Sequence, residues 1–180
     1  MIAGNAEYSG LRHMNKRVWA GLLMLAGLAA PAFGQTATFK EKQGDWSVYA
    51  YDAGSKKTCF AVAQPRTKKP AKVRRDPVYF YVSNWPKDKV TGEISLKMGY
   101  PLKPGVPAEV KIASATFQLF TKDEVAYVEK TEDEQKVITA MKAGATMIVN
   151  GRSTRGTLTT DTYSLTGISK ALEAAAKACQ

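Results

Sequence analysis

Short segments in which apolar and polar residues alternate recur along the chain from residue 45 onwards, separated by turns rich in glycine, proline and charge. An alternation of period two predicts a strand with one buried face, because successive side chains of a strand point to opposite sides. In residues 45–52 it places Trp46, Val48 and Ala50 on one face. Similar strands are expected at 58–64, 78–85, 92–98, 108–112, 116–121, 125–128, 146–150 and 157–165. Many short strands with regular turns predict a mainly β, single-domain antiparallel β-sandwich or barrel.

One helix is predicted within this series of strands, at about 131–143. Val137, Ile138 and Met141 form its apolar stripe. Thr131 and Glu134 have the spacing of a capping box, which predicts Thr131 as the N-cap and Glu134 as its reciprocal partner. An amphipathic helix of this length has to bury its stripe, so we expect it to pack on an open end or edge of the sheet.

A short C-terminal helix is predicted at about 168–178. Ile168, Leu172, Ala175 and Cys179 recur at helical spacing and form one stripe, which directs Cys179 towards the core. The other cysteine of the chain is Cys59, in an early predicted strand. A disulfide between Cys59 and Cys179 would tie the last helix to that strand. The alternative is two buried thiols, and the redox compartment decides between them.

The N-terminus indicates export. Residues 15–17 include two basic side chains, residues 18–30 form an apolar run, and small residues follow up to Gly34. These are the three regions of a secretory signal peptide, and the run is shorter than a membrane-spanning helix requires, although a retained anchor is the alternative. We therefore expect residues 1–34 to be an N-terminal extension and signal peptide, with Met14 as a possible true start, and residues 35–180 to be one domain.

The charge balance describes a basic exported domain. Residues 35–180 number 146 and carry 23 basic and 15 acidic side chains, a net charge of +8. That length is typical of one domain with a real core. Export favours the Cys59–Cys179 disulfide, because disulfides persist in oxidising compartments, and we expect no transmembrane segment after cleavage.

The basic residues are densest in residues 65–77, which also contain three prolines. Proline and charge together predict an exposed loop. A cluster of this size is typical of sites that recognise anionic surfaces, such as lipid phosphates or acidic glycans. A solvated loop that serves solubility is the alternative, and a nucleic-acid partner is not expected. The anion-binding candidates are Arg66, Lys68, Lys69, Lys72, Arg74 and Arg75.

Two further groups of residues are candidates for a binding site. Arg152, Arg155 and Asp161 lie on the late hairpin, where they form either a ligand site or, through an Arg155–Asp161 pair, a structural lock. Five tyrosines have the rigid surface and polar tip that suit sugar or protein binding, but such residues also serve packing inside strands. These are Tyr49, Tyr51, Tyr79, Tyr81 and Tyr163.

Candidate chemistry is sparse. The single histidine, His13, precedes the predicted cleavage site, so the mature domain would lack the commonest general base and metal ligand. No metal or cofactor is expected. Acidic clusters remain, and with Arg152 or Arg155 they support a carboxylate-dependent envelope hydrolase as an alternative function.

Several motifs resemble the invasion associated locus B family of exported bacterial proteins. The most specific part is the pattern from Gly151 to Leu165, GRSTRGTLTTDTYSL, and shorter matches precede it in the same order. The shorter matches are Asp45-Trp46, residues 75–80, Gly99-Tyr100-Pro101, Phe120-Thr121 and residues 140–142. The resemblance covers about residues 45–179.

The resemblance implies a β-rich, non-enzymatic protein of the periplasm or outer membrane surface, and some members of the family are similar to factors that help bacteria enter host cells. It supplies no catalytic residues. We expect an interaction factor whose partner is an anionic envelope surface, a glycan or a protein. The alternatives are the hydrolase and a structural or stress-related envelope factor that docks a partner through the helix at 131–143.

Overall fold

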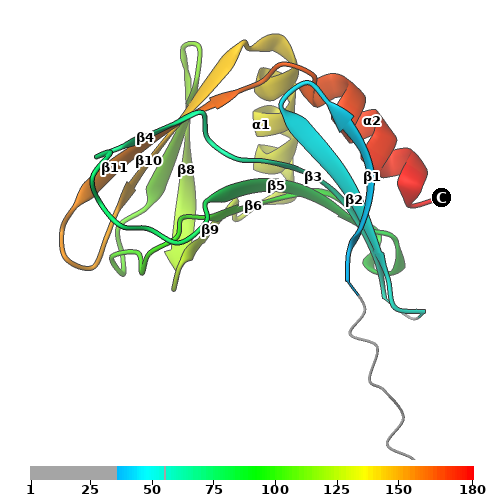
Figure 1. The fold of residues 1–180 in the computed structure, drawn as a ribbon, viewed down its shortest axis with the longest axis horizontal. Helices are drawn as coiled ribbons and strands as arrows, with labels where there is room; N and C mark the ends of the chain where they lie inside the picture. Colours follow the sequence, from blue (N-terminus) through cyan, green and yellow to red (C-terminus); the bar gives the residue numbers. More distant parts are fainter. Residues whose placement is uncertain (1–35, 55) are drawn as a thin grey trace, which may run out of the picture. The chain divides into compact units, whose positions relative to one another are not determined.

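One antiparallel sheet carries the fold. The computed structural model describes residues 36–54 and 56–180, and within them it contains eleven strands, two α-helices and one short 3-10 helix, η1 (Figure 1). The predicted signal peptide lies outside the described residues. The strands are β1 (Thr38–Gln43), β2 (Trp46–Asp52), β3 (Lys57–Ala63), β4 (Thr67–Lys69), β5 (Tyr79–Trp85), β6 (Val90–Lys97), β7 (Ala108–Ile112), β8 (Ala115–Lys122), β9 (Val125–Tyr127), β10 (Thr146–Arg152) and β11 (Leu158–Ser164). The helices are η1 (Pro86–Asp88), α1 (Thr131–Ala143) and α2 (Ile168–Ala178).

The sheet divides into two arms at β8. The strand order is β1-β2-β3-β5-β6-β9-β8-β7-β10-β11-β4, so β1 and β4 are the two edges and the sheet is not a closed barrel. Residues 115–119 of β8 pair with β7, whereas residues 120–122 pair with β9. We call β1, β2, β3, β5, β6 and β9 the first arm, and β7, β10, β11 and β4 the second arm.

The two arms share one core. Phe80 of β5 contacts Tyr163 of β11 and Trp46 of β2, with ring centroids 5.9 and 6.0 Å apart. The indole Nε1 of Trp46 donates a hydrogen bond to the carbonyl oxygen of Ser164 at 3.1 Å. Because the Phe80–Tyr163 contact and the Trp46–Ser164 hydrogen bond cross between the arms, the inner faces of both halves of the sheet bury each other. The mainly β, antiparallel prediction is confirmed.

The edge strands β1 and β4 were not predicted. Both are exposed along almost their whole length, and neither has an apolar face for periodicity to reveal. β1 is held by backbone pairing with β2, and β4, which falls in the predicted basic loop, pairs with β11. Lysine-rich edges of this kind hinder pairing with other chains.

The helix α1 is confirmed, but its predicted capping box is wrong. Lys130 is the N-cap, and no side chain caps the helix. Glu134 instead turns inwards, where its Oε1 accepts a hydrogen bond of 3.1 Å from the backbone N–H of Ile94 in β6. Burial raises the pKa of Glu134 above its ordinary value. This carboxyl group therefore joins α1 to the first arm.

The helix α2 and the disulfide are also confirmed. α2 packs along β2 and β3, with Ala171 and Ala175 fully buried (Figure 1). Cys59 of β3 and Cys179 at the end of α2 are bonded, with sulfur atoms 2.09 Å apart. The bond joins residues 120 positions apart, so it ties the C-terminal helix to the early part of the sheet.

Within the described part of the chain, no helix combines the length and the apolar character that crossing a bilayer would require.

Candidate functional site

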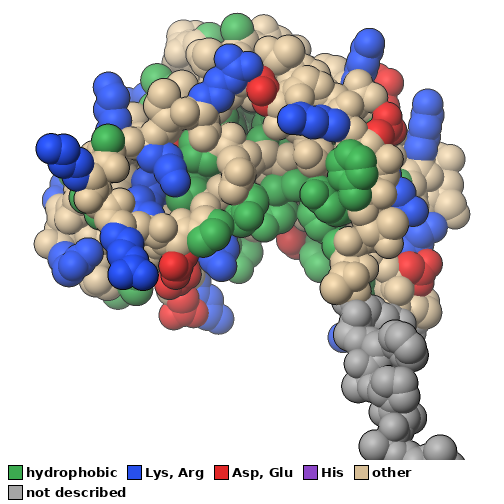
Figure 2. Space-filling view, viewed as in Figure 1, with side chains coloured by type: hydrophobic (Ala, Val, Ile, Leu, Met, Phe, Trp, Pro, Cys, Tyr) green, Lys and Arg blue, Asp and Glu red, His purple; other side chains and the backbone are tan. Residues whose placement is uncertain are grey.

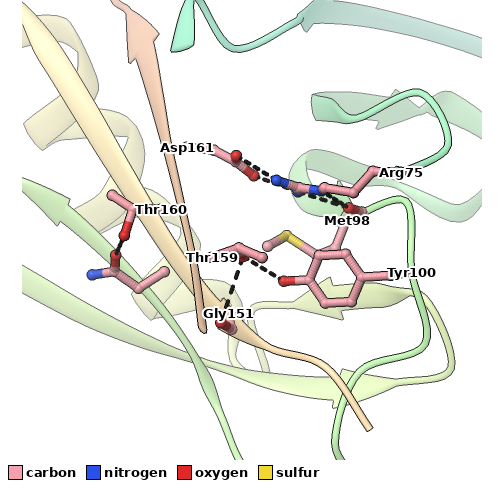
Figure 3. A network of polar contacts seen from close by, with 8 residues as sticks. Arg75, Met98, Tyr100, Gly151, Thr159, Thr160 and Asp161 are labelled. Carbon is pink, nitrogen blue, oxygen red and sulfur yellow. Dashed lines mark hydrogen bonds and ion pairs between the residues drawn. The ribbon is translucent and has the colours of Figure 1, made fainter. Parts of the chain in front are cut away.

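A buried ion pair joins the loop before β5 to the strand β11. The guanidinium of Arg75 donates two parallel hydrogen bonds to the carboxylate of Asp161, at 2.7 and 2.6 Å (Figure 3). Its Nη2 also donates to the carbonyl oxygen of Met98 at 2.8 Å. The exposed fractions of the two side chains are only 2% and 0%. Bidentate geometry together with a third acceptor is what a charged pair needs to be tolerated away from water.

Tyr100 extends this network to the late hairpin. Its ring lies under the guanidinium of Arg75, with the Arg75 Cζ 4.9 Å from the ring centroid. The phenol oxygen is 2.6 Å from the hydroxyl of Thr159 on β11, which in turn contacts the carbonyl oxygen of Gly151 on β10 (Figure 3). Residues of the sequence pattern that carries the family resemblance thus hold three segments of the chain together.

Burial and neighbouring charges shift the pKa values of the side chains in this network. Burial opposes the charge of Arg75, but the hydrogen bonds and charge of Asp161 outweigh it and raise the pKa of the guanidinium. Burial also raises the pKa of the Tyr100 and Tyr163 phenols, and the Tyr163 hydroxyl has no hydrogen-bond partner within the described residues. The network therefore places the Arg75–Asp161 ion pair beside phenols whose pKa values are raised, which is an arrangement for fixing structure.

Two expectations are corrected by this pair. Arg75 was predicted as an exposed anion-binding residue, and it is instead turned inwards and committed to Asp161. An Arg155–Asp161 lock was one of the two alternatives for the late hairpin, and the partner of Asp161 is instead Arg75, because β11 turns the Asp161 side chain towards the core while Arg155 stays exposed at the hairpin turn. Asp161 is thus unavailable to a substrate, which removes one of the acids that a carboxylate-dependent hydrolase could use near Arg152 or Arg155.

The other predicted basic residues lie around the β10–β11 hairpin. Lys68 and Lys69 on β4 are exposed and pair in register with Asp161 and Thr160 of β11. Arg74 and Arg155 line a shared surface hollow of about 480 Å³, together with Tyr100 and the acidic residues Asp76 and Glu124. Figure 2 shows several blue side chains over this part of the molecule. We call Lys68, Lys69, Lys72, Arg74 and Arg155 the basic end.

Two arginines of the predicted groups have local partners instead. Arg66 forms an ion pair of 2.6 Å with Asp45, in which both side chains remain accessible to solvent. The pKa of Asp45 is lowered, first by a hydrogen bond from Ser164 and further by Arg66. Arg152 lies 3.5 Å from the carbonyl oxygen of Gly156 across the hairpin turn. Among the predicted basic residues, the members of the basic end are thus the ones that stay exposed and form no ion pair within the described residues.

An aromatic row crosses the face of the first arm that points away from the core. Phe39, Tyr49, Phe60 and Tyr81 follow one another across β1, β2, β3 and β5, with successive ring centroids 5.5, 5.6 and 5.8 Å apart. Tyr79 continues the row at 5.7 Å from Tyr81. Figure 2 shows apolar side chains gathered in a hollow on this side.

Four of the five predicted tyrosines lie on this face, and Tyr163 is the exception because it is fully buried in the core. Tyr51 lines a groove of about 440 Å³ on the same face, together with Phe60, Tyr81 and Trp85. Phe60 and Trp85 were missed as site residues. The period-two alternation of their strands carries the signal, because it puts them on the same side as the tyrosines.

Comparisons with known proteins agree with this fold. The family model described as Invasion associated locus B (IalB) protein matches residues 46–176. A crystal structure of invasion associated protein B from Bartonella henselae is similar, with a TM-score of 0.55 and 16% sequence identity, covering 78% of this chain and 96% of that chain. At that identity the likeness concerns the fold alone. No curated protein matches the chain.

Proposed function

Because this chain belongs to the invasion associated locus B family, we propose that it is an exported, non-enzymatic binding protein of the bacterial envelope. It acts in the periplasm or at the outer membrane surface, where the basic end attaches it to an anionic surface. The family is not a known enzyme family. The signal-peptide pattern of residues 15–34 and the Cys59–Cys179 disulfide support export, because disulfides persist in oxidising compartments.

The observation that carries this proposal is the gathering of exposed cations at the basic end. β4 and the turn of the β10–β11 hairpin come from distant parts of the sequence, yet both contribute exposed cations to it. The Arg75–Asp161 pair fixes the intervening loop, so the cations are held on a rigid support. A loop backbone that is already in place reduces the conformational entropy lost on binding, which favours attachment to phosphate or carboxylate groups.

Two alternative functions have less support. The apolar stripe of α1 is buried against the sheet, with Val137 and Met141 fully covered, so that face is not free to dock a partner. The hydrolase alternative cannot use Asp161, which is closed off by Arg75. Neither alternative accounts for the exposed cations.

Export is tested by fractionating cells that express the full chain and determining the N-terminus of the product by mass spectrometry. We expect the protein in the periplasm or outer-membrane fraction, beginning at Gln35. A protein that keeps residues 1–34 and stays in the cytoplasm would overturn this part of the proposal.

Attachment is tested with residues 35–180 in a vesicle sedimentation assay, using vesicles with and without anionic phospholipid. We expect binding to the anionic vesicles and its loss in the variant Lys68→Gln/Lys69→Gln/Lys72→Gln/Arg74→Gln. The matched control is Lys130→Gln/Lys142→Gln/Lys170→Gln/Lys177→Gln, which removes the same charge from exposed positions elsewhere. Equal losses in both variants would mean that net charge, rather than the basic end, governs attachment.

A role in host-cell entry is the finer part of the proposal. A deletion strain complemented with the basic-end variant should enter host cells as poorly as the deletion strain itself, whereas the control variant should restore entry. If the deletion strain enters host cells as well as the wild type, the protein has no role in host-cell entry.

A further inference from the structure

The groove on the aromatic face continues into a lysine-rich mouth. A second hollow of about 290 Å³ adjoins the groove, and Lys56 and Trp85 line both. Lys57 and Lys87 complete the basic lining of this second hollow, alongside Asp88. We call the apolar groove the slot and the lysine-lined second hollow the mouth. The two share part of their lining.

The register of the strands explains why the groove is open. Phe60 of β3 stands opposite Ser83 of β5, and Tyr81 of β5 stands opposite Ser95 of β6. Each ring thus faces a small side chain across the strand pair, which leaves a channel between the rings. Its walls are mainly apolar, and its volume falls in the range of small-molecule sites.

Other features indicate what the groove would hold. The Trp85 side chain lines both the slot and the mouth, so it extends the apolar surface from one to the other. Glu93 also lines the groove, opposite Ser83, and its charge disfavours an anionic group deeper in the slot. An anionic head would accordingly be directed to the lysines.

From this geometry we infer that the groove binds a single-chain anionic amphiphile of the fatty-acid type, one molecule at a time. The alkyl chain lies between Phe60 and Tyr81, over Ser83 and Ser95. The carboxylate lies in the mouth near Lys56, Lys57 and Lys87. Charge complementarity selects this occupant, because an uncharged sugar would leave the three ammonium groups unused.

The test is isothermal titration calorimetry of residues 35–180 with laurate, dodecyltrimethylammonium and dodecyl maltoside, each below its critical micelle concentration. We expect one laurate per chain, and an affinity for laurate at least about tenfold above that for the other two ligands. Lys56→Gln/Lys57→Gln/Lys87→Gln should weaken laurate binding roughly tenfold. The charge-matched control Lys122→Gln/Lys130→Gln/Lys142→Gln should leave it unchanged.

A filling variant tests the slot itself. Ser95→Trp places a bulky ring between the existing ones and suits a strand, so it should abolish laurate binding while the fold is retained. Thr116→Trp, at an exposed position of β8, is the matched control. Ser95→Trp should leave sedimentation with anionic vesicles intact, because that attachment uses the basic end. Equal affinity for all three head groups, unchanged laurate binding in Ser95→Trp, or no uptake of laurate would each overturn the inference.

Discussion

Arg75 and Asp161 are 86 positions apart in the sequence, yet they meet in two parallel hydrogen bonds inside the protein. The pair joins the loop after β4 to the strand that β4 itself pairs with, so the loop is closed at both of its ends. The residues of the basic end are exposed, whereas the charged side chains of Arg75 and Asp161 are buried. The loop that carries Lys72 and Arg74 of the basic end is therefore fixed by an arginine that is itself buried.

Replacing one partner of this pair should destabilise the protein more than its share of the loss when both partners are replaced. Arg75→Met or Asp161→Leu alone leaves one buried partner uncompensated and should lower the free energy of unfolding by about 3–5 kcal/mol. The double variant Arg75→Met/Asp161→Leu should lose clearly less than the sum of the two single changes. Urea unfolding of the four proteins measures the coupling. Additive losses would show that the two side chains do not depend on each other.

Gly99 should be far less replaceable than Gly105. Both have positive φ, +74° and +72°, but a Cβ at Gly99 would collide with the carbonyl oxygen of Asp76, whereas Gly105 has open space around it. Gly105→Ala should cost about 1 kcal/mol of backbone strain, and Gly99→Ala roughly 2–4 kcal/mol, because the Arg75 loop must also shift. Thermal unfolding compares the stabilities of the two variants. Equal losses of stability would mean that the backbone at Asp76 can move away from the new Cβ at little cost.

The disulfide should provide a large share of the stability. In the chain-entropy treatment, a bond closing a separation of 120 residues contributes about 4–5 kcal/mol. Cys59→Ala/Cys179→Ala should lose that amount in urea unfolding, and a reducing agent should destabilise the wild type but not this variant. A wild-type protein whose stability is unchanged by the reducing agent would contradict this expectation.

Glu134 should make stability fall as the pH rises. Burial raises its pKa in the folded state above the ordinary 4.5, so the folded protein holds the proton more tightly than the unfolded chain. The stabilising contribution is fully present below the ordinary pKa and is lost as the pH rises through the raised value. Glu134→Gln keeps the acceptor for Ile94 and cannot ionise, so it should remove this dependence.

The check is urea unfolding of both proteins from acidic to neutral pH, with the exposed Glu132→Gln as the matched control. The difference in unfolding free energy between Glu134→Gln and the wild type should grow with pH. A constant difference would show that Glu134 is not desolvated in the folded state.

The sequence predicts elements best where burial imposes a period. The strand containing Trp46, Val48 and Ala50 and the helix carrying Val137 and Met141 were both found, because a buried face leaves a pattern. β1 and β4 were missed since backbone pairing alone holds them, and exposed residues such as Lys68 carry no such pattern.

The candidate site was predictable only in part. Local composition located the basic loop and four of the aromatic-face tyrosines. It could not separate Arg75 from Arg74, because adjacent arginines look alike until the position of Asp161 on β11 is known. For the same reason, Glu134 looked like a capping residue, and its true partner on β6 is 40 positions away. Polar contacts between residues distant in the sequence leave no periodic pattern along the chain.

The claim that the basic end attaches this protein to an anionic surface is tested most directly by the salt dependence of vesicle binding. The affinity of residues 35–180 for anionic vesicles should fall steeply as salt is raised, because screening weakens exposed charges. In Lys68→Gln/Lys69→Gln/Lys72→Gln/Arg74→Gln the affinity should be low and almost independent of salt, while the control variant Lys130→Gln/Lys142→Gln/Lys170→Gln/Lys177→Gln follows the wild type. Binding that is equally strong in high salt, or a basic-end variant with the salt dependence of the wild type, would contradict the account.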